Sequence, residues 1–175
     1  KNKSLFIGIV VLALLAVAGF GAWTYFSGER DKKVQAELYE FSKGSLTSLM
    51  DKSLPPAEFV NAFNRLADKL GSHDAVFAKG IEAVIALKNL SANTEALSIL
   101  EKVQPMAKNS FQQFVLNTNL SVAYENLGKN DLALAALESL IKNNAGIMEA
   151  KVYLDVGRLA LALGQNDKAR SNLQW

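Results

Sequence analysis

The sequence predicts an all-helical protein in which one apolar segment precedes a series of repeated helical hairpins. Three observations lead to this prediction. Residues 5–26 carry a single polar side chain, Thr24. The rest of the chain reads as helices of about 15 residues between short polar breaks, and no segment alternates with the period of two typical of strands. One block of sequence also recurs at intervals of 36 and 37 residues.

The composition excludes several classes of site. None of the 175 residues is cysteine, so the sequence contains no disulfide framework, thiolate zinc site or cysteine nucleophile. Residues 1–33 contribute a formal charge of +3 to the total of +2, which leaves −1 for the remainder. Because nucleic-acid binding needs a basic patch or stripe, we expect no nucleic-acid partner for this nearly neutral remainder.

The apolar segment 5–26 predicts a single transmembrane helix. A helix of its 22 residues would reach roughly 33 Å, enough to cross a hydrocarbon core of about 30 Å. Trp23, Tyr25 and Phe26 end the segment, and aromatic rings favour the headgroup region. A buried core helix is disfavoured because the segment has no polar face.

A cleaved signal peptide is the alternative. Lys1 and Lys3 precede the apolar run, and Ala16-Val17-Ala18 resembles a cleavage site. The run continues to Phe26, further than a signal peptide requires, so we favour a retained anchor.

These observations predict that the chain consists of an anchor segment and one repeat domain. Residues 1–33 form a membrane anchor with its juxtamembrane segment, and residues 34–175 form a helical repeat domain that we expect to be truncated at its C-terminal end. Three basic residues follow the apolar segment and two precede it, a small difference that by itself favours a cytoplasmic domain. An N-terminal signal anchor usually exports its domain, and we expect that arrangement here.

An internal repeat organises the domain. Three segments share its pattern: Asn89–Ala96, Asn126–Ala133 and Ala162–Ala169. Gly128 and Gly164 suit the left-handed position just past a helix end. The Asn or Asp that follows can cap the next helix. One alanine in each copy is placed to let two helices pack closely: Ala96, Ala133 and Ala169.

The polar breaks divide the domain into three and a half to four helix pairs. The expected pairs are 33–50 with 57–70, 74–90 with 94–107, 111–127 with 131–143, and 148–163 with 167–175. The last helix has barely two turns, which is why the final pair is incomplete.

This pattern resembles the tetratricopeptide repeat (TPR) family, whose units are helical hairpins of about 34 residues. Tyr124 matches the family's aromatic position, Gly157 its small position, and Ala133 and Ala169 its second-helix alanine. The resemblance covers residues 34–175 and implies a TPR-like α-solenoid.

Three positions depart from the family pattern. Asn117 replaces the early tryptophan, Ser121 the glycine-like residue and Ala145 the closing proline. The combination of one N-terminal span with divergent repeats is similar to the YfgM-like family, the ancillary subunits of the Sec translocon. That resemblance implies a single-pass protein of the bacterial inner membrane whose repeats face the periplasm and hold protein partners, as a scaffold or chaperone-like accessory of protein export. A structural part of a secretion or motility complex, or a cleaved secreted binding protein, remain alternatives.

A solenoid offers a continuous concave surface lined by the first helix of each pair. The repeat phase places eight candidate partner-binding residues there: Lys88, Asn89, Thr118, Val122, Glu125, Asn126, Leu154 and Arg158. Ile81, Ile85 and Leu161 share the same phase.

The chain shows no pattern of catalytic residues. His73 is the only histidine and follows Gly71-Ser72 at a helix boundary, which favours a turn or cap role over a metal ligand. Glu37 and Glu40 lie one turn apart and indicate a solvated face. Neither a phosphate-binding loop nor a Ser-His-Asp set is present. We therefore expect no enzyme, cofactor, metal or small-molecule substrate.

Overall fold

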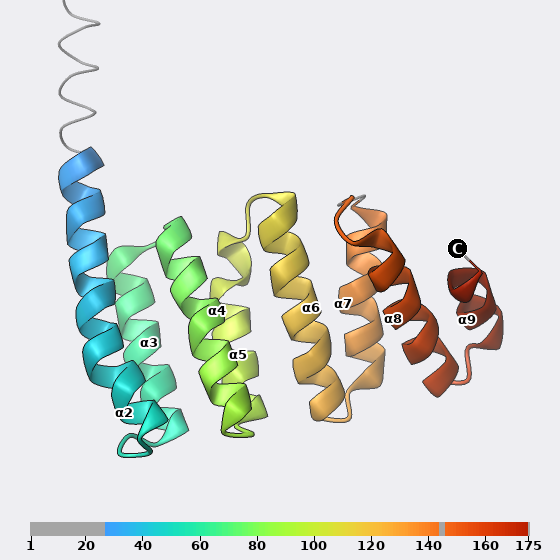
Figure 1. Ribbon diagram of the computed structural model, residues 1–175, viewed down its shortest axis with the longest axis horizontal. Helices are drawn as coiled ribbons and strands as arrows, with labels where there is room; N and C mark the ends of the chain where they lie inside the picture. The colour runs from blue at the N-terminus through green and yellow to red at the C-terminus, as the bar shows by residue number, and fades with distance from the viewer. Residues whose placement is uncertain (1–26, 144–145, 175) are drawn as a thin grey trace, which may run out of the picture. The chain divides into compact units, whose positions relative to one another are not determined.

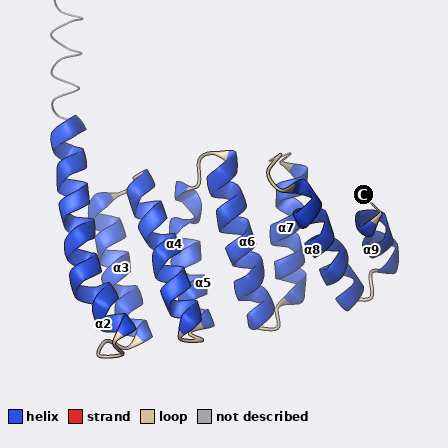
Figure 2. Cartoon of the chain, viewed as in Figure 1, coloured by secondary structure: helices blue, strands red, loops and turns tan. Residues whose placement is uncertain are grey.

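The computed structural model describes residues 27–143 and 146–174, and all regular structure within these ranges is helical (Figure 2). The predicted all-α class is therefore confirmed for the described residues. The predicted transmembrane helix, 5–26, lies outside them. None of the described helices combines the length and hydropathy needed to cross a bilayer. The chain divides into two compact units, Lys1–Glu40 and Phe41–Trp175.

The second unit contains a regular succession of helices joined by short turns (Figure 1). The α-helices described there are α2 (Thr47–Met50), α3 (Pro56–Leu70), α4 (Asp74–Asn89), α5 (Asn93–Val103), α6 (Ser110–Asn126), α7 (Asn130–Lys142), α8 (Glu149–Ala162) and α9 (Asn166–Leu173). A 3₁₀ turn, Gln104–Met106, extends α5. Every helix predicted from residue 57 onward is present, with most ends shifted by one or two residues.

The helices form successive pairs. Packing within pairs joins α4 to α5, α6 to α7 and α8 to α9, and packing between pairs joins α5 to α6 and α7 to α8. In Figure 1, α4, α6 and α8 lie nearer the viewer than α5 and α7. The first helix of each pair therefore belongs to one layer and the second helix to the other.

The predicted helix 33–50 is not a regular α-helix throughout. Residues 27–41 are α-helical, but a π-helical turn, Ser42–Leu46, separates them from α2. The Thr47 hydroxyl donates a hydrogen bond to the Ser42 carbonyl, five residues back, at 3.0 Å, and this contact supports the wider turn. Lys79 of α4 donates to the Ser42 hydroxyl at 2.8 Å. This contact between distant residues could not be read from local sequence.

An aromatic cluster joins the start of the second unit to α3. Phe59 and Phe63 are completely buried, and the Phe41 ring lies 5.4 Å from the first and 6.0 Å from the second, centroid to centroid. Gly80 of α4 approaches the same region closely. A Cβ atom on Gly80 would lie 2.5 Å from Cγ1 of buried Val103, so only glycine permits this approach of α4 to α5.

The repeat alanines are buried as predicted: Ala96, Ala133 and Ala169. Gly157 also has the predicted role of a small residue at a close helix contact. A Cβ atom there would lie 2.6 Å from Cγ of Leu173 in α9. Tyr124 is half-buried against the cluster of α7 and α8 side chains. The helical phase inferred from the repeat is therefore confirmed.

Asn117, at the position of the family's tryptophan, is buried between α6 and α7. Its amide nitrogen donates to the Gln113 carbonyl at 2.9 Å, and its amide oxygen accepts from the Ser139 hydroxyl at 3.1 Å. A hydrogen bond from one helix to the other thus replaces the packing of a large ring.

The turns after α4, α6 and α8 share one geometry. Gly128 and Gly164 both have φ of 72°, as predicted, and Ser91 occupies the equivalent position with φ of 58°. The prediction that Asn or Asp caps the following helix is wrong. The cap positions are held by Ala92, Lys129 and Gln165, none of which makes a side-chain cap bond. In each turn the residue that follows the left-handed residue takes the cap position. The asparagine after it is therefore the first residue of the helix: Asn93, Asn130 and Asn166.

Replacing Ser91 with glycine should stabilise the protein. A side chain in the left-handed region costs about 1–2 kcal/mol, and the greater chain entropy of unfolded glycine offsets part of that, leaving a gain of about 0.5–1 kcal/mol. Urea denaturation checks this value. Gly128→Ala is the reciprocal variant. No other residue lies within 4 Å of the position of its new Cβ, so any loss of stability would come from backbone strain alone. An unchanged midpoint for both variants would contradict the shared turn geometry.

Candidate partner-binding face

We use the name A-helix face for the eight residues predicted from the repeat phase together with Ile81, Ile85 and Leu161. All of them lie on α4, α6 or α8. Four carry exposed apolar side chains: Ile85 (53%), Val122 (41%), Leu154 (58%) and Leu161 (57%). Two of them, Ile85 and Val122, occupy equivalent repeat positions on successive first helices, and apolar side chains gathered on one exposed face indicate a contact surface.

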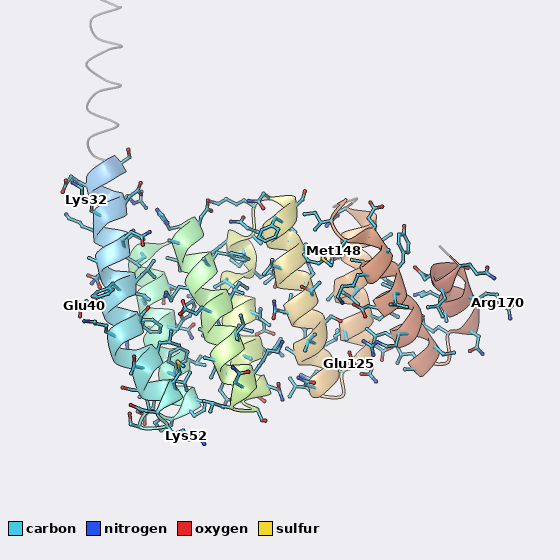
Figure 3. All side chains as sticks on the ribbon, in the orientation of Figure 1. Lys32, Glu40, Lys52, Glu125, Met148 and Arg170 are labelled. Atoms are coloured by element: carbon cyan, nitrogen blue, oxygen red, sulfur yellow. The ribbon has the colours of Figure 1, made fainter. Side chains whose placement is uncertain are left out.

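Glu125 and Arg158 come together on this face. The guanidinium of Arg158 on α8 donates to both carboxylate oxygens of Glu125 on α6, at 2.6 and 2.9 Å. These hydrogen bonds hold the pKa of Glu125 below its ordinary value of 4.5, and the pKa of Arg158 is raised in turn. Figure 3 shows Glu125 near the C-terminal end of α6. The repeat phase placed both residues on this face without predicting that they bind each other.

Other charges on the first helices are also neutralised locally. Asp155 forms an ion pair with Lys151 one turn away, and its carboxylate lies 3.9 Å from Nε of Arg158. Glu82 on α4 pairs with Lys79. A charged partner would therefore have to compete with bonds that the protein already makes.

The remaining predicted residues differ in the burial and hydrogen bonding of their side chains. Lys88 is half-buried with Nζ 3.5 Å from the Asn119 amide oxygen, and burial lowers its pKa. The Thr118 hydroxyl donates to the Phe114 carbonyl of its own helix at 2.8 Å. Asn89 is exposed and lines a groove described below.

Asn126 contributes to packing between repeats. Its amide nitrogen donates to the Asn93 amide oxygen on α5 at 3.1 Å. Asn93 is the first residue of α5, so this hydrogen bond joins two neighbouring helix pairs.

One part of the surface was missed by sequence reasoning. Leu46 and Met50, before and within α2, line a groove together with Ile85, Ala86 and Leu90 of the α4 region. Met50 precedes a polar turn and has no repeat equivalent, so no pattern in the sequence singled it out.

His73 has the predicted cap role. It is the N-cap of α4, and its Nδ1 accepts a hydrogen bond from the Ala75 backbone N–H at 3.2 Å. Among the described residues, no group of three or more His, Cys, Asp or Glu side chains is arranged to hold a metal ion.

The fold resembles that of a known TPR-like protein. A Podosopora anserina kinesin light chain with nearly identical TPR-like repeats superposes with a TM-score of 0.53 at 17% identity, covering 82% of this chain and 85% of the other. The MamA RS-1 ArsTM double mutant matches at 15% identity over 79% of this chain and 91% of the other, with a TM-score of only 0.31. No protein-family model and no curated protein matches the sequence.

The class of protein follows from this similarity. The described residues form a TPR-like helical repeat. At this level of identity the similarity shows the fold alone.

The Glu125–Arg158 ion pair should make a small, pH-dependent contribution to stability. Glu125→Gln, Arg158→Gln and the double variant should give a coupling energy of about 0.2–1 kcal/mol at neutral pH, since the pair is partly exposed. Because the pKa of Glu125 is depressed in the folded state, this stabilisation exists above its ordinary value of 4.5 and is lost as the pH falls through the lower folded value. Urea denaturation of the four proteins at neutral and acidic pH measures it. A coupling that grows on acidification would contradict the pairing.

Proposed function

We propose that this protein is a membrane-anchored scaffold that recruits protein partners through its A-helix face. In this proposal residues 5–26 cross the inner membrane of a bacterium and the repeat domain faces the periplasm. The protein would serve the export machinery there as a chaperone-like accessory, as the resemblance to the YfgM-like family implies.

The observation that carries the proposal is the row of exposed apolar side chains on α4, α6 and α8. Ile85 and Val122 occupy equivalent repeat positions on neighbouring first helices. The TPR-like fold supports the same function, because stacked repeats present their first helices as one extended surface. Interface energy usually concentrates in a few central residues, and Val122 is central in this row.

The test is partner recovery from gently solubilised membranes. Val122→Asp should reduce the recovery of partner proteins strongly while leaving the helical content unchanged, because Val122 is exposed on α6. Leu132→Asp is the matched control, since Leu132 is similarly exposed but belongs to the second-helix layer, on α7. Equal recovery by both variants and wild type would contradict an A-helix docking surface.

The same membrane preparation tests whether the anchor is retained. The protein should remain in the pellet after alkaline carbonate washing, with peptides preceding Gly19 detectable by mass spectrometry. A soluble form beginning at Gly19 would indicate a cleaved signal peptide instead. The partners identified would separate an export accessory from a component of a secretion or motility complex.

A further inference from the structure

A groove lies between α2 and α4 in the second unit. It has a volume of about 310 Å³, and its lining residues are Leu46, Met50, Glu82, Ile85, Ala86, Asn89 and Leu90. That volume is at the lower end of the range of sites that take organic ligands, about 300–1,000 Å³.

The groove exposes apolar side chains to water. Leu46 is buried, whereas Met50 is 67% exposed and Ile85 is 53% exposed. A flexible thioether such as that of methionine adapts to irregular apolar surfaces. An occupant that covers Met50 and Ile85 would remove both from water.

The groove is electrically neutral. Among the described residues that line it, Glu82 is the only charged one, and its carboxylate is paired with Lys79. Lys79 also donates to the Ser42 hydroxyl, so this cation is held in place. Among the residues that line this groove, an acidic or basic occupant would find no unpaired opposite charge, whereas an uncharged one leaves the existing pair undisturbed.

The groove continues into a second, more polar depression. That depression has a volume of about 530 Å³ and shares Asn89 and Leu90 with the first. Its lining includes Lys52 and Ser91, both with left-handed backbone conformation, and the Ser53-Leu54-Pro55 turn. A chain-like occupant could therefore place an apolar part against Met50 and a polar flank beside Ser91, which a compact small molecule could not.

We propose that the groove between α2 and α4 binds an uncharged, apolar peptide segment of a partner protein. This inference rests on the proposed scaffold function and names the chemical class of what the surface holds. The apolar side chains of the segment lie against Met50, Ile85 and Leu90, and its polar flank follows Asn89 toward Ser91.

The three methionines of the chain allow a direct test. Met50 lies in the groove, Met106 is buried, and Met148 is 59% exposed but outside the groove. The full chain, labelled with ¹³C at the methionine methyl groups, is placed in lipid nanodiscs and titrated with a soluble peptide of leucine and valine flanked by serine and glycine. The Met50 methyl signal, assigned with Met50→Leu, should shift while those of Met106 and Met148 do not.

A matched pair of variants and a second peptide complete the experiment. Ile85→Asp should weaken binding about tenfold or more, whereas Leu132→Asp, similarly exposed but on α7 and outside the A-helix face, should leave it unchanged. A peptide with aspartates in place of the apolar residues should cause no shift.

Several outcomes would overturn the inference. These are no shift at Met50, equal shifts at Met50 and Met148, or equal binding of the acidic peptide. A Met50 shift that follows protein concentration without peptide would instead indicate a second copy of this chain as the occupant. Because the titration uses a purified protein and a synthetic peptide, its failure is distinguishable from a failure to recover partners through Val122.

Discussion

Replacing Phe63 with alanine is expected to destabilise the protein by about 3–5 kcal/mol. The Phe63 ring is completely buried, meets the Phe41 ring edge-on at a centroid distance of 6.0 Å, and lies close to Gly80 of α4. Removing it leaves a cavity where α3, α4 and the start of the second unit meet. Because Gly80 has no side chain, it cannot help to fill that cavity.

Urea denaturation followed by circular dichroism would measure this loss. Phe111→Ala is the matched control, since Phe111 near the start of α6 is mostly exposed and its removal should change stability within about 0.5 kcal/mol. If both variants lose the same stability, the aromatic cluster is not the core of this region.

Replacing Ala133 with phenylalanine is expected to cost roughly 1–3 kcal/mol or more, because the new ring overpacks a filled core. Ala133 is completely buried in a cluster that contains Leu137 of α7, Val156 and Ala160 of α8, and Ala169 of α9. Stacked repeats can separate only by breaking such contacts, so we expect the last two helix pairs to loosen first.

The control lies two residues along the same helix. Ala135 is exposed on α7, so Ala135→Phe introduces the same ring into solvent and should leave the thermal midpoint nearly unchanged. Equal midpoints for the Ala133 and Ala135 variants would show that the repeat phase is wrong.

The agreement between sequence and structure is best where the physical cause is local. The helix ends of α4, α6 and α7 fall within one residue of prediction. Glycine tolerates the left-handed conformation, and the positions of Gly128 and Gly164 alone therefore located two turns correctly. Burial of Ala96, Ala133 and Ala169 followed from one repeated block of sequence.

The disagreements arise where neighbours compete for a side chain. An Asn or Asp after Gly128 and Gly164 was expected to cap the next helix, but Lys129 and Gln165 hold the cap positions. The expected regular helix over 33–50 instead contains a π-helical turn, where Thr47 and Lys79 both bind Ser42. Local propensity contains no information about a partner 37 residues away.

On the A-helix face, too, the properties with a local cause were predicted and those that depend on distant residues were not. Repeat phase placed Ile85 and Val122 at equivalent positions of two first helices, and both are exposed, because equivalent positions in a repeat have equivalent surroundings. Phase could not show that Glu125 and Arg158 neutralise each other, because their contact depends on the spacing between two helices and on side-chain conformation.

The sequence by itself determined the helical class, the repeat intervals and the burial of the repeat alanines, since these follow from periodicity and from glycine and alanine positions. Only the tertiary structure decided which charges on the first helices are paired and that Met50 and Ile85 share a groove. Those properties depend on distances between residues remote in the chain, which the packing of whole helices sets.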